Sequence, residues 1–211
     1  ISLTKLSLPI SLQQLFLALG LTVFFYFIGF LGTTALAAAN VLVTISLSTI
    51  LPGIGFGLAS LSLVGQALGT GKPTLAKQWG LDVCVVGSVI SLCLGLTLFL
   101  FSRPILGLFI YNPATLELAL TPFRIDCLFI WIQVGGLILL HSLTGAGATK
   151  LVMGLSFVLQ WGIFLPIVFL LGPLLQLGLV PIWLFNVGYQ VCVTLLLWWV
   201  WVRYRWDRIF V

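Results

Sequence analysis

Long apolar runs separated by short polar connections make up most of this chain. The runs lack the alternating polar and apolar positions of a half-buried strand, and each is long enough for a helix to cross a bilayer, which takes about 20 residues. The pattern therefore predicts six membrane-spanning helices, at residues 9–31, 35–68, 79–101, 122–144, 151–171 and 179–202.

The connection between the third and fourth predicted spans contains two helix-start signals. Asn112 suits an N-cap and Pro113 the first turn of a helix, and the segment after them is apolar enough to lie at the membrane interface. Thr121 and Pro122 repeat the signal. We therefore expect a short interfacial segment and a new helix that starts at Pro122.

Composition excludes a water-soluble fold. Hydrophobic residues make up 61% of the 211 residues and charged residues 6%, whereas a globular domain carries roughly 25% charged residues. In a bilayer the backbone must satisfy its own hydrogen bonds, which leaves helices or a closed barrel. The runs are too long and too uniform for barrel strands. The expected fold is an all-α, multi-pass integral membrane protein.

The charges predict the orientation. Six spans place both termini on one side, and seven basic residues then share that side: Lys5, Lys72, Lys77, Lys150, Arg203, Arg205 and Arg208. Arg103 and Arg124 fall on the other side. The positive-inside bias predicts cytoplasmic termini, in a plasma or inner membrane. Since the basic residues flank spans, their expected partners are membrane lipids, not nucleic acid.

No motif predicts an enzyme, a cofactor or a metal site. His141 is the single histidine and has no HExxH context. The run 65–72 fails the phosphate-loop pattern, because Gln66 stands where a glycine is required and Pro73 where Ser or Thr is required. The four cysteines form no CxxC pair. We expect no catalytic residue, no bound cofactor and no metal.

Polar residues inside the spans are the candidate functional residues. Asp126 is the sharpest, because a charge at mid-helix costs about 2.5–3.5 kcal/mol, and less near an interface. It could instead be a charge at the interface that orients its helix. The uncharged candidates are Gln13, Gln14, Tyr26, Asn40, Gln133, Gln160, Asn186 and Gln190. Each could join two helices, or the group could line a polar cavity.

The second predicted span contains candidates for a bend. Pro52 removes one backbone hydrogen bond, and Gly53 and Gly55 lie beside it. Small residues also recur four apart, as in Gly53 and Gly57, a spacing that lets helices approach closely. Static packing and a hinge both fit this pattern. Pro166 is the bend candidate in the fifth span.

Three segments resemble the carboxyl-terminal half of a MATE (multidrug and toxic compound extrusion) transporter. The first is 35–77, with its ALAAAN start, the Pro-Gly-Ile-Gly around Pro52, and the ending from Val64 to Lys72. The second is Leu-Thr-Gly-Ala-Gly-Ala-Thr-Lys at 143–150, similar to the family's L-R-G-x-G-D-T turn. The third is Pro166 followed by 177–183.

The resemblance implies a twelve-helix protein of two six-helix lobes, of which residues 1–211 form one. Such proteins export organic cations and other amphipathic compounds by proton or sodium antiport, through a cavity between lobes that alternate in access. Tyr26, Asn40, Gln133, Gln14 and Asp126 are the cavity candidates in this chain. The remaining partner would be the amino-terminal lobe, because a chain that begins at Ile1 resembles a fragment.

The chain departs from some family members where they carry acids. Tyr26 follows Phe24-Phe25 where many members have a glutamate, and the region of Gln133 lacks an aspartate that some have. We therefore expect the coupling carboxylate in the other lobe. Two alternatives stay open: a flippase for lipids or lipid-linked oligosaccharides, and a truncated membrane module that transports nothing.

Overall fold

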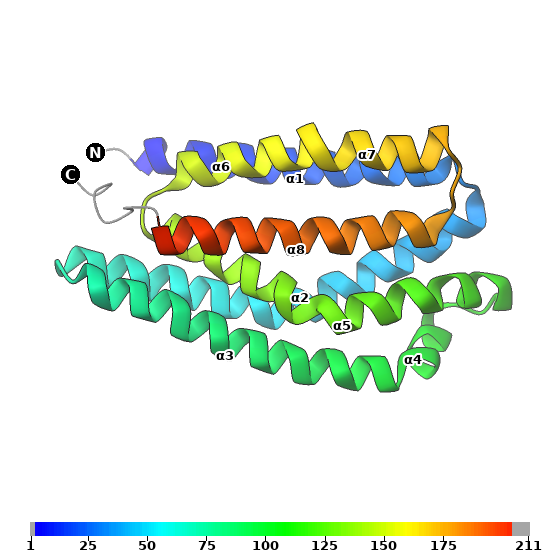
Figure 1. The fold of residues 1–211 in the computed structure, drawn as a ribbon, viewed down its shortest axis with the longest axis horizontal. Coiled ribbons are helices and arrows are strands. Elements are labelled where there is room, and N and C mark those ends of the chain that lie inside the picture. The colour runs from blue at the N-terminus through cyan, green and yellow to red at the C-terminus, as the bar shows by residue number, and fades with distance from the viewer. Residues whose placement is uncertain (1–2, 204–211) are drawn as a thin grey trace.

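The computed structural model describes residues 3–203, with side chains from residue 10, so Arg205 and Arg208 and the side chain of Lys5 lie outside the described part. Within it the chain is helical (Figure 1): α1 Leu3–Gly29, α2 Thr33–Gly69, α3 Pro73–Leu100, α4 Ser102–Phe109, α5 Pro113–Gly145, α6 Thr149–Phe157, η1 Val158–Phe164, α7 Leu165–Phe169, η2 Leu170–Leu174 and α8 Leu179–Arg203. Six of the helical stretches are long and apolar enough to cross a membrane. The all-α, six-span prediction is confirmed.

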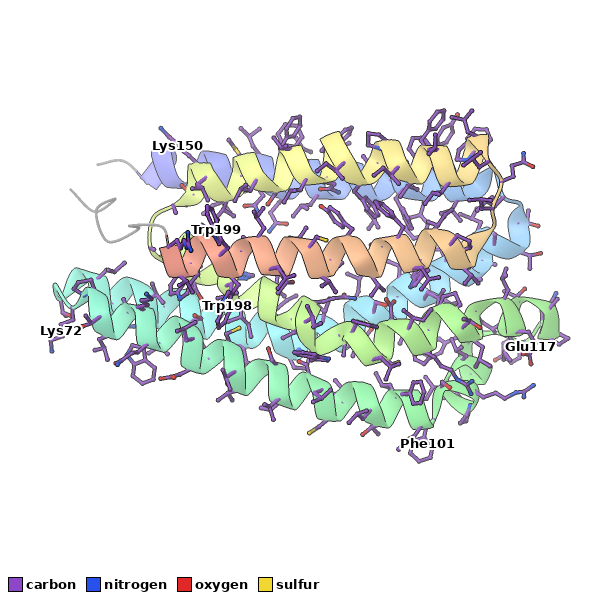
Figure 2. The ribbon with its side chains drawn as sticks, viewed as in Figure 1. Lys72, Phe101, Glu117, Lys150, Trp198 and Trp199 are labelled. Atoms are coloured by element: carbon purple, nitrogen blue, oxygen red, sulfur yellow. The ribbon has the colours of Figure 1, made fainter. Side chains whose placement is uncertain are left out.

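The helices form a bundle in which α5 is central. It packs against α2, α3 and α8, while α1 packs against α6 and η1. In Figure 1, α1 with α6 and α7 lies along one side of the bundle and α3 along the other, with α8 between them. Figure 2 shows Lys72 and Lys150 at the end where α1 begins, and Phe101 and Glu117 toward the opposite end. The cytoplasmic placement of the termini stays a prediction.

Helix α5 differs from the sequence prediction. Asn112 caps it as expected, since its Oδ1 accepts a hydrogen bond from the Ala114 N–H at 2.9 Å. The prediction of a new helix at Pro122 was wrong, because α5 runs unbroken from Pro113 to Gly145 with Pro122 inside it. Proline costs a helix one backbone hydrogen bond, and membrane helices tolerate that loss where neighbouring helices pack around it. Pro122 and Phe123 are both buried.

Small residues determine how closely α2 and α3 approach α5. The buried face of α3 consists of Ala76, Gly80, Cys84, Gly87, Ser91 and Gly95. On α2, a β-carbon at Gly53 would lie 2.9 Å from the Val134 side chain, and one at Gly57 would lie 2.8 Å from His141. These two glycines therefore serve close packing. His141 itself bonds within α5, to the carbonyl of Leu137 at 2.8 Å.

The fifth span is helical along its length but not uniformly α-helical. Two π-helical pieces, η1 and η2, flank the five-residue α7, which begins just before Pro166. A π turn widens the helix and often occurs at functional sites. Piece η1 faces the cavity described next.

Candidate functional site

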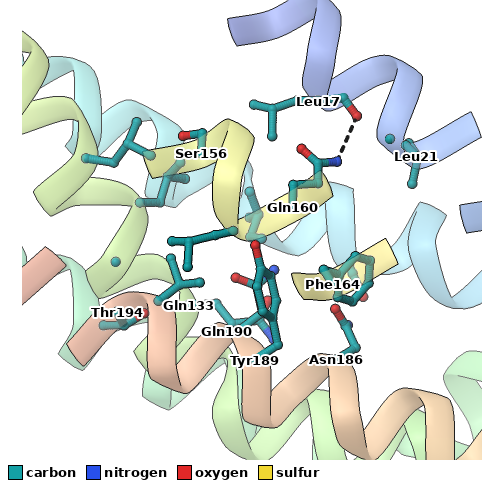
Figure 3. A pocket seen from close by; sticks show the side chains of 18 of the residues that line it. Leu17, Leu21, Gln133, Ser156, Gln160, Phe164, Asn186, Tyr189, Gln190 and Thr194 are labelled. Carbon is teal, nitrogen blue, oxygen red and sulfur yellow. Dashed lines mark hydrogen bonds between the residues drawn. The ribbon is translucent and has the colours of Figure 1, made fainter. Parts of the chain in front are cut away.

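A cavity of about 470 Å³ lies inside the bundle, lined by α1, α2, α5, α6 with η1, and α8. Most of its wall is aliphatic or aromatic. Its polar lining gathers amide, hydroxyl and carboxyl groups from α5, α6, η1 and α8: Asp126, Gln133, Ser156, Gln160, Asn186 and Gln190. Figure 3 shows the last five of these residues around the cavity. A concave apolar chamber with a few converging polar groups is the usual form of a small-molecule site.

Asp126 is the acidic residue in the described lining of this cavity. It lies on α5 with 7% of its surface exposed. Its Oδ2 accepts hydrogen bonds from the Ser46 hydroxyl on α2, at 3.0 Å, and from the Trp183 indole on α8, at 2.9 Å. Its Oδ1 has no hydrogen-bond partner among the described residues. The carboxyl group thus joins helices α2, α5 and α8.

The cavity offers that carboxyl group no counter-charge. Among the described residues that line it there is no lysine, arginine or histidine. A buried ionised carboxylate is costly unless it is paired or hydrogen-bonded. The donors to this carboxyl group are neutral, so the cavity suits a positively charged guest or a proton.

Gln160 lines the cavity and, like Asp126, holds a buried oxygen without a hydrogen-bond partner among the described residues. Its Nε2 donates to the Leu17 carbonyl of α1 at 3.4 Å, as the dashed line in Figure 3 marks, and its Oε1 has no partner among the described residues. The next residue, Trp161, donates to the Phe16 carbonyl at 3.3 Å. Gly20 makes room for this contact, because a β-carbon there would overlap the Gln160 amide. The seam between α1 and η1 is therefore closed by side chains that bond to backbone.

The structure divides the candidates predicted from sequence into two groups. Asp126 and Gln133 line the cavity. Gln14, Tyr26 and Asn40 lie outside it on exposed positions of α1 and α2, and Tyr26 is 66% exposed. Sequence reasoning missed Ser46, Trp183 and Tyr189 as cavity residues. Serine hydroxyls and interfacial aromatics are too common in membrane helices for pattern alone to mark them.

A polar stripe runs along the exposed face of α2. At helical spacing it exposes Asn40, Thr44, Ser48, Pro52, Gly55, Ala59, Ser62 and Gln66. Helix α1 adds Gln14, Thr22 and Tyr26. The exposed side chains of α3 are in contrast mostly large and apolar, including Val85, Val86, Val89, Ile90, Leu96 and Leu100. The α3 surface therefore suits lipid, whereas the exposed surface of α1 and α2 mixes this stripe of small and polar residues with exposed leucines such as Leu15, Leu51 and Leu58.

The bend candidates fall on both faces of α2. Pro52 and Gly55 are exposed on the polar stripe, and nothing lies within 4 Å of a β-carbon placed at Gly55. Gly53 is buried against α5. Figure 1 shows that α2 changes direction along its length. Among the described residues no group of three His, Cys, Asp or Glu side chains could hold a metal ion.

Comparisons with known proteins agree with this architecture. The MatE family model matches residues 9–170. A probable multidrug resistance protein NorM of Thermotoga maritima is 26% identical over 85% of this chain and 39% of its own length. The multidrug resistance protein NorM of Burkholderia vietnamiensis is 30% identical over 81% of this chain and 37% of its own. The chain thus spans about two-fifths of these relatives.

Solved structures show the same fold. A crystal structure of MATE in complex with MaL6 superposes with a TM-score of 0.87 at 18% identity, covering 98% of this chain and 46% of that one. A transporter of the MOP superfamily from Pyrococcus furiosus superposes with a TM-score of 0.77 at 21% sequence identity, covering 97% of this chain and 45% of that one. With the family model matched over most of its length, and with six apolar helices arranged as in these transporters, this chain belongs to the MatE family of multi-pass membrane transporters.

Proposed function

We propose that this chain is one lobe of a secondary active exporter of organic cations and amphipathic compounds, driven by proton or sodium antiport. Its relatives are named as multidrug resistance proteins, and the chain covers less than half of their length. The polar α1–α2 face, with Tyr26 and Asn40, would border the pathway between two lobes. The cavity around Asp126 would hold the charged end of the substrate.

The single observation that supports this proposal best is the unbalanced charge of the cavity. Asp126 is the acidic residue of the described lining, which holds no basic side chain. A lipophilic cation would place its charge at Asp126 and its hydrophobic body against the apolar wall. An anionic guest would meet a carboxylate in a poorly solvated chamber and be repelled.

Binding of fluorescent probes to the purified chain tests the proposal, because the cavity lies within this lobe. We expect rhodamine 6G, a lipophilic cation, to bind more tightly than fluorescein, an anion. Asp126→Asn should weaken cation binding about tenfold or more, the usual cost of losing a charge-assisted contact. The matched control is Asp82→Asn, since Asp82 is exposed on α3 and does not line the cavity. Equal affinities for all three proteins would refute the proposal.

The flippase alternative makes a different prediction for the same cavity. A carrier of anionic lipid headgroups would need basic groups in its lining, and the described lining has none. A truncated, inactive module is the other alternative. The same binding experiment tests this alternative, because an inactive module has no reason to retain specific binding of rhodamine 6G.

A further inference from the structure

Arg124 is held in place at the end of the bundle opposite the start of α1. Its Nε donates to the hydroxyl of Ser102, the first residue of α4, at 3.0 Å. Its guanidinium carbon lies 5.9 Å from the centre of the Phe99 ring on α3, within the range of a cation–π contact. Two neighbouring helices therefore fix the position of a cation that belongs to α5.

No acidic side chain among the described residues pairs with Arg124. Glu117 at this end of the bundle (Figure 2) binds Arg103 instead, at 2.6 Å. Asp126 is buried in the cavity, where it accepts from Ser46 and Trp183. Arg124 is exposed and uses only Nε within the described part of the chain, so both Nη groups of its fork remain for an external acceptor.

An apolar strip continues along α5 from Arg124. Leu128 is 41% exposed and Trp131 is 39% exposed, four and seven residues further on, which places all three on one helix face. At the rise of an α-helix, the two apolar residues lie about 6 and 10 Å from Arg124 along the axis. This is the shape of a phospholipid: a charged head above an apolar tail.

We propose that Arg124 binds the phosphate of an anionic phospholipid whose acyl chain lies over Leu128 and Trp131. The free Nη groups match the paired oxygens of a phosphate, which a guanidinium can bind through two parallel hydrogen bonds. A lipid is a better occupant than a second protein lobe, because the neighbouring α3 exposes large aliphatic side chains such as Leu96 and Leu100. The stripe of small and polar residues that suits a protein or water lies on α2.

Quenching of tryptophan fluorescence by brominated phospholipids tests this site. The chain and its Trp131→Phe variant are reconstituted in phosphatidylcholine with increasing brominated phosphatidylglycerol, and the difference between them isolates Trp131. We expect the site at Trp131 to bind phosphatidylglycerol about fivefold more tightly than phosphatidylcholine. One basic residue at an anionic membrane surface contributes about 1 kcal/mol, which corresponds to that factor.

Three variants decide the outcome. Arg124→Gln should bring the preference close to one, and Arg124→Lys should retain part of it, because lysine keeps the charge but not the fork. Arg103→Gln is the matched control, as Arg103 lies at the same end, 67% exposed, but is already paired. An unchanged preference in Arg124→Gln, an equal loss in Arg103→Gln, or no preference in the unaltered chain would overturn the proposal.

Discussion

Gly145, the last residue of α5, should tolerate no side chain. A β-carbon there would overlap the Leu61 carbonyl oxygen and lie 2.9 Å from the Leu61 Cα, so the obstacle is the backbone of α2 and not a flexible side chain. Gly145→Ala must therefore push α2 and α5 apart at their carboxyl-terminal ends, which are predicted to lie on the cytoplasmic side. Overpacking costs typically 1–3 kcal/mol, and an obstacle that cannot rotate away belongs at the upper end, about 3 kcal/mol.

The assay is thermal unfolding of the purified chain in detergent, followed by loss of its monodisperse peak. At about 2–4 °C per kcal/mol for a chain of this size, Gly145→Ala should lower Tm by about 6–12 °C. The control is Gly55→Ala on α2, where nothing lies within 4 Å of the new β-carbon. Alanine favours helix over glycine by about 1 kcal/mol, so this control should keep or slightly raise Tm. Equal Tm values for the two variants would show that α2 and α5 are not in backbone contact.

Four further predictions concern the cavity and the second lobe of the proposed transporter. Trp183→Phe removes one donor from Asp126 and should destabilise the chain by about 1–3 kcal/mol, seen as a lower Tm; an unchanged Tm would mean that the indole does not donate to Asp126. Gly20→Ala should leave Tm nearly unchanged, since the Gln160 amide can swing aside, but should alter rhodamine 6G affinity; unaltered affinity would exclude Gln160 from the binding surface. In proteoliposomes the chain alone should drive no efflux, and in a two-lobed transporter that contains it, removing the carboxylates of the other lobe should abolish gradient-driven export. Efflux by the chain alone would contradict the first expectation, and export that survives those substitutions would contradict the second.

The sequence predicted the class of fold because bilayer physics leaves few solutions. Apolar runs of sufficient length must be helices, and their count determines whether the termini share a side. The continuity of α5 through Pro122 could not be predicted, because it depends on tertiary packing around the proline. The π-helical pieces next to Pro166 likewise leave no pattern in hydrophobicity.

The candidate site was predictable in part, and most sharply in its rarest residue. Asp126 stands out because an acid in an apolar helix is costly, and it does lie in the cavity. Gln133 and Tyr26 looked equivalent in the sequence, yet one lines the cavity and the other lies on the surface, since the direction of a side chain depends on helix rotation. Trp183 could not be assigned, because its partner Asp126 lies on a helix distant in sequence.

Helix α2 has one consequence that extends beyond this lobe. Its inner face lines the cavity through Ser46 and Ile50, while Asn40 and Ser48 stand on its outer polar stripe. A single helix, about 10 Å thick, thus separates these two sets of side chains. A guest in the cavity would contact one face of the same helix whose other face carries the polar stripe, so a displacement of α2 by the guest would move both faces together.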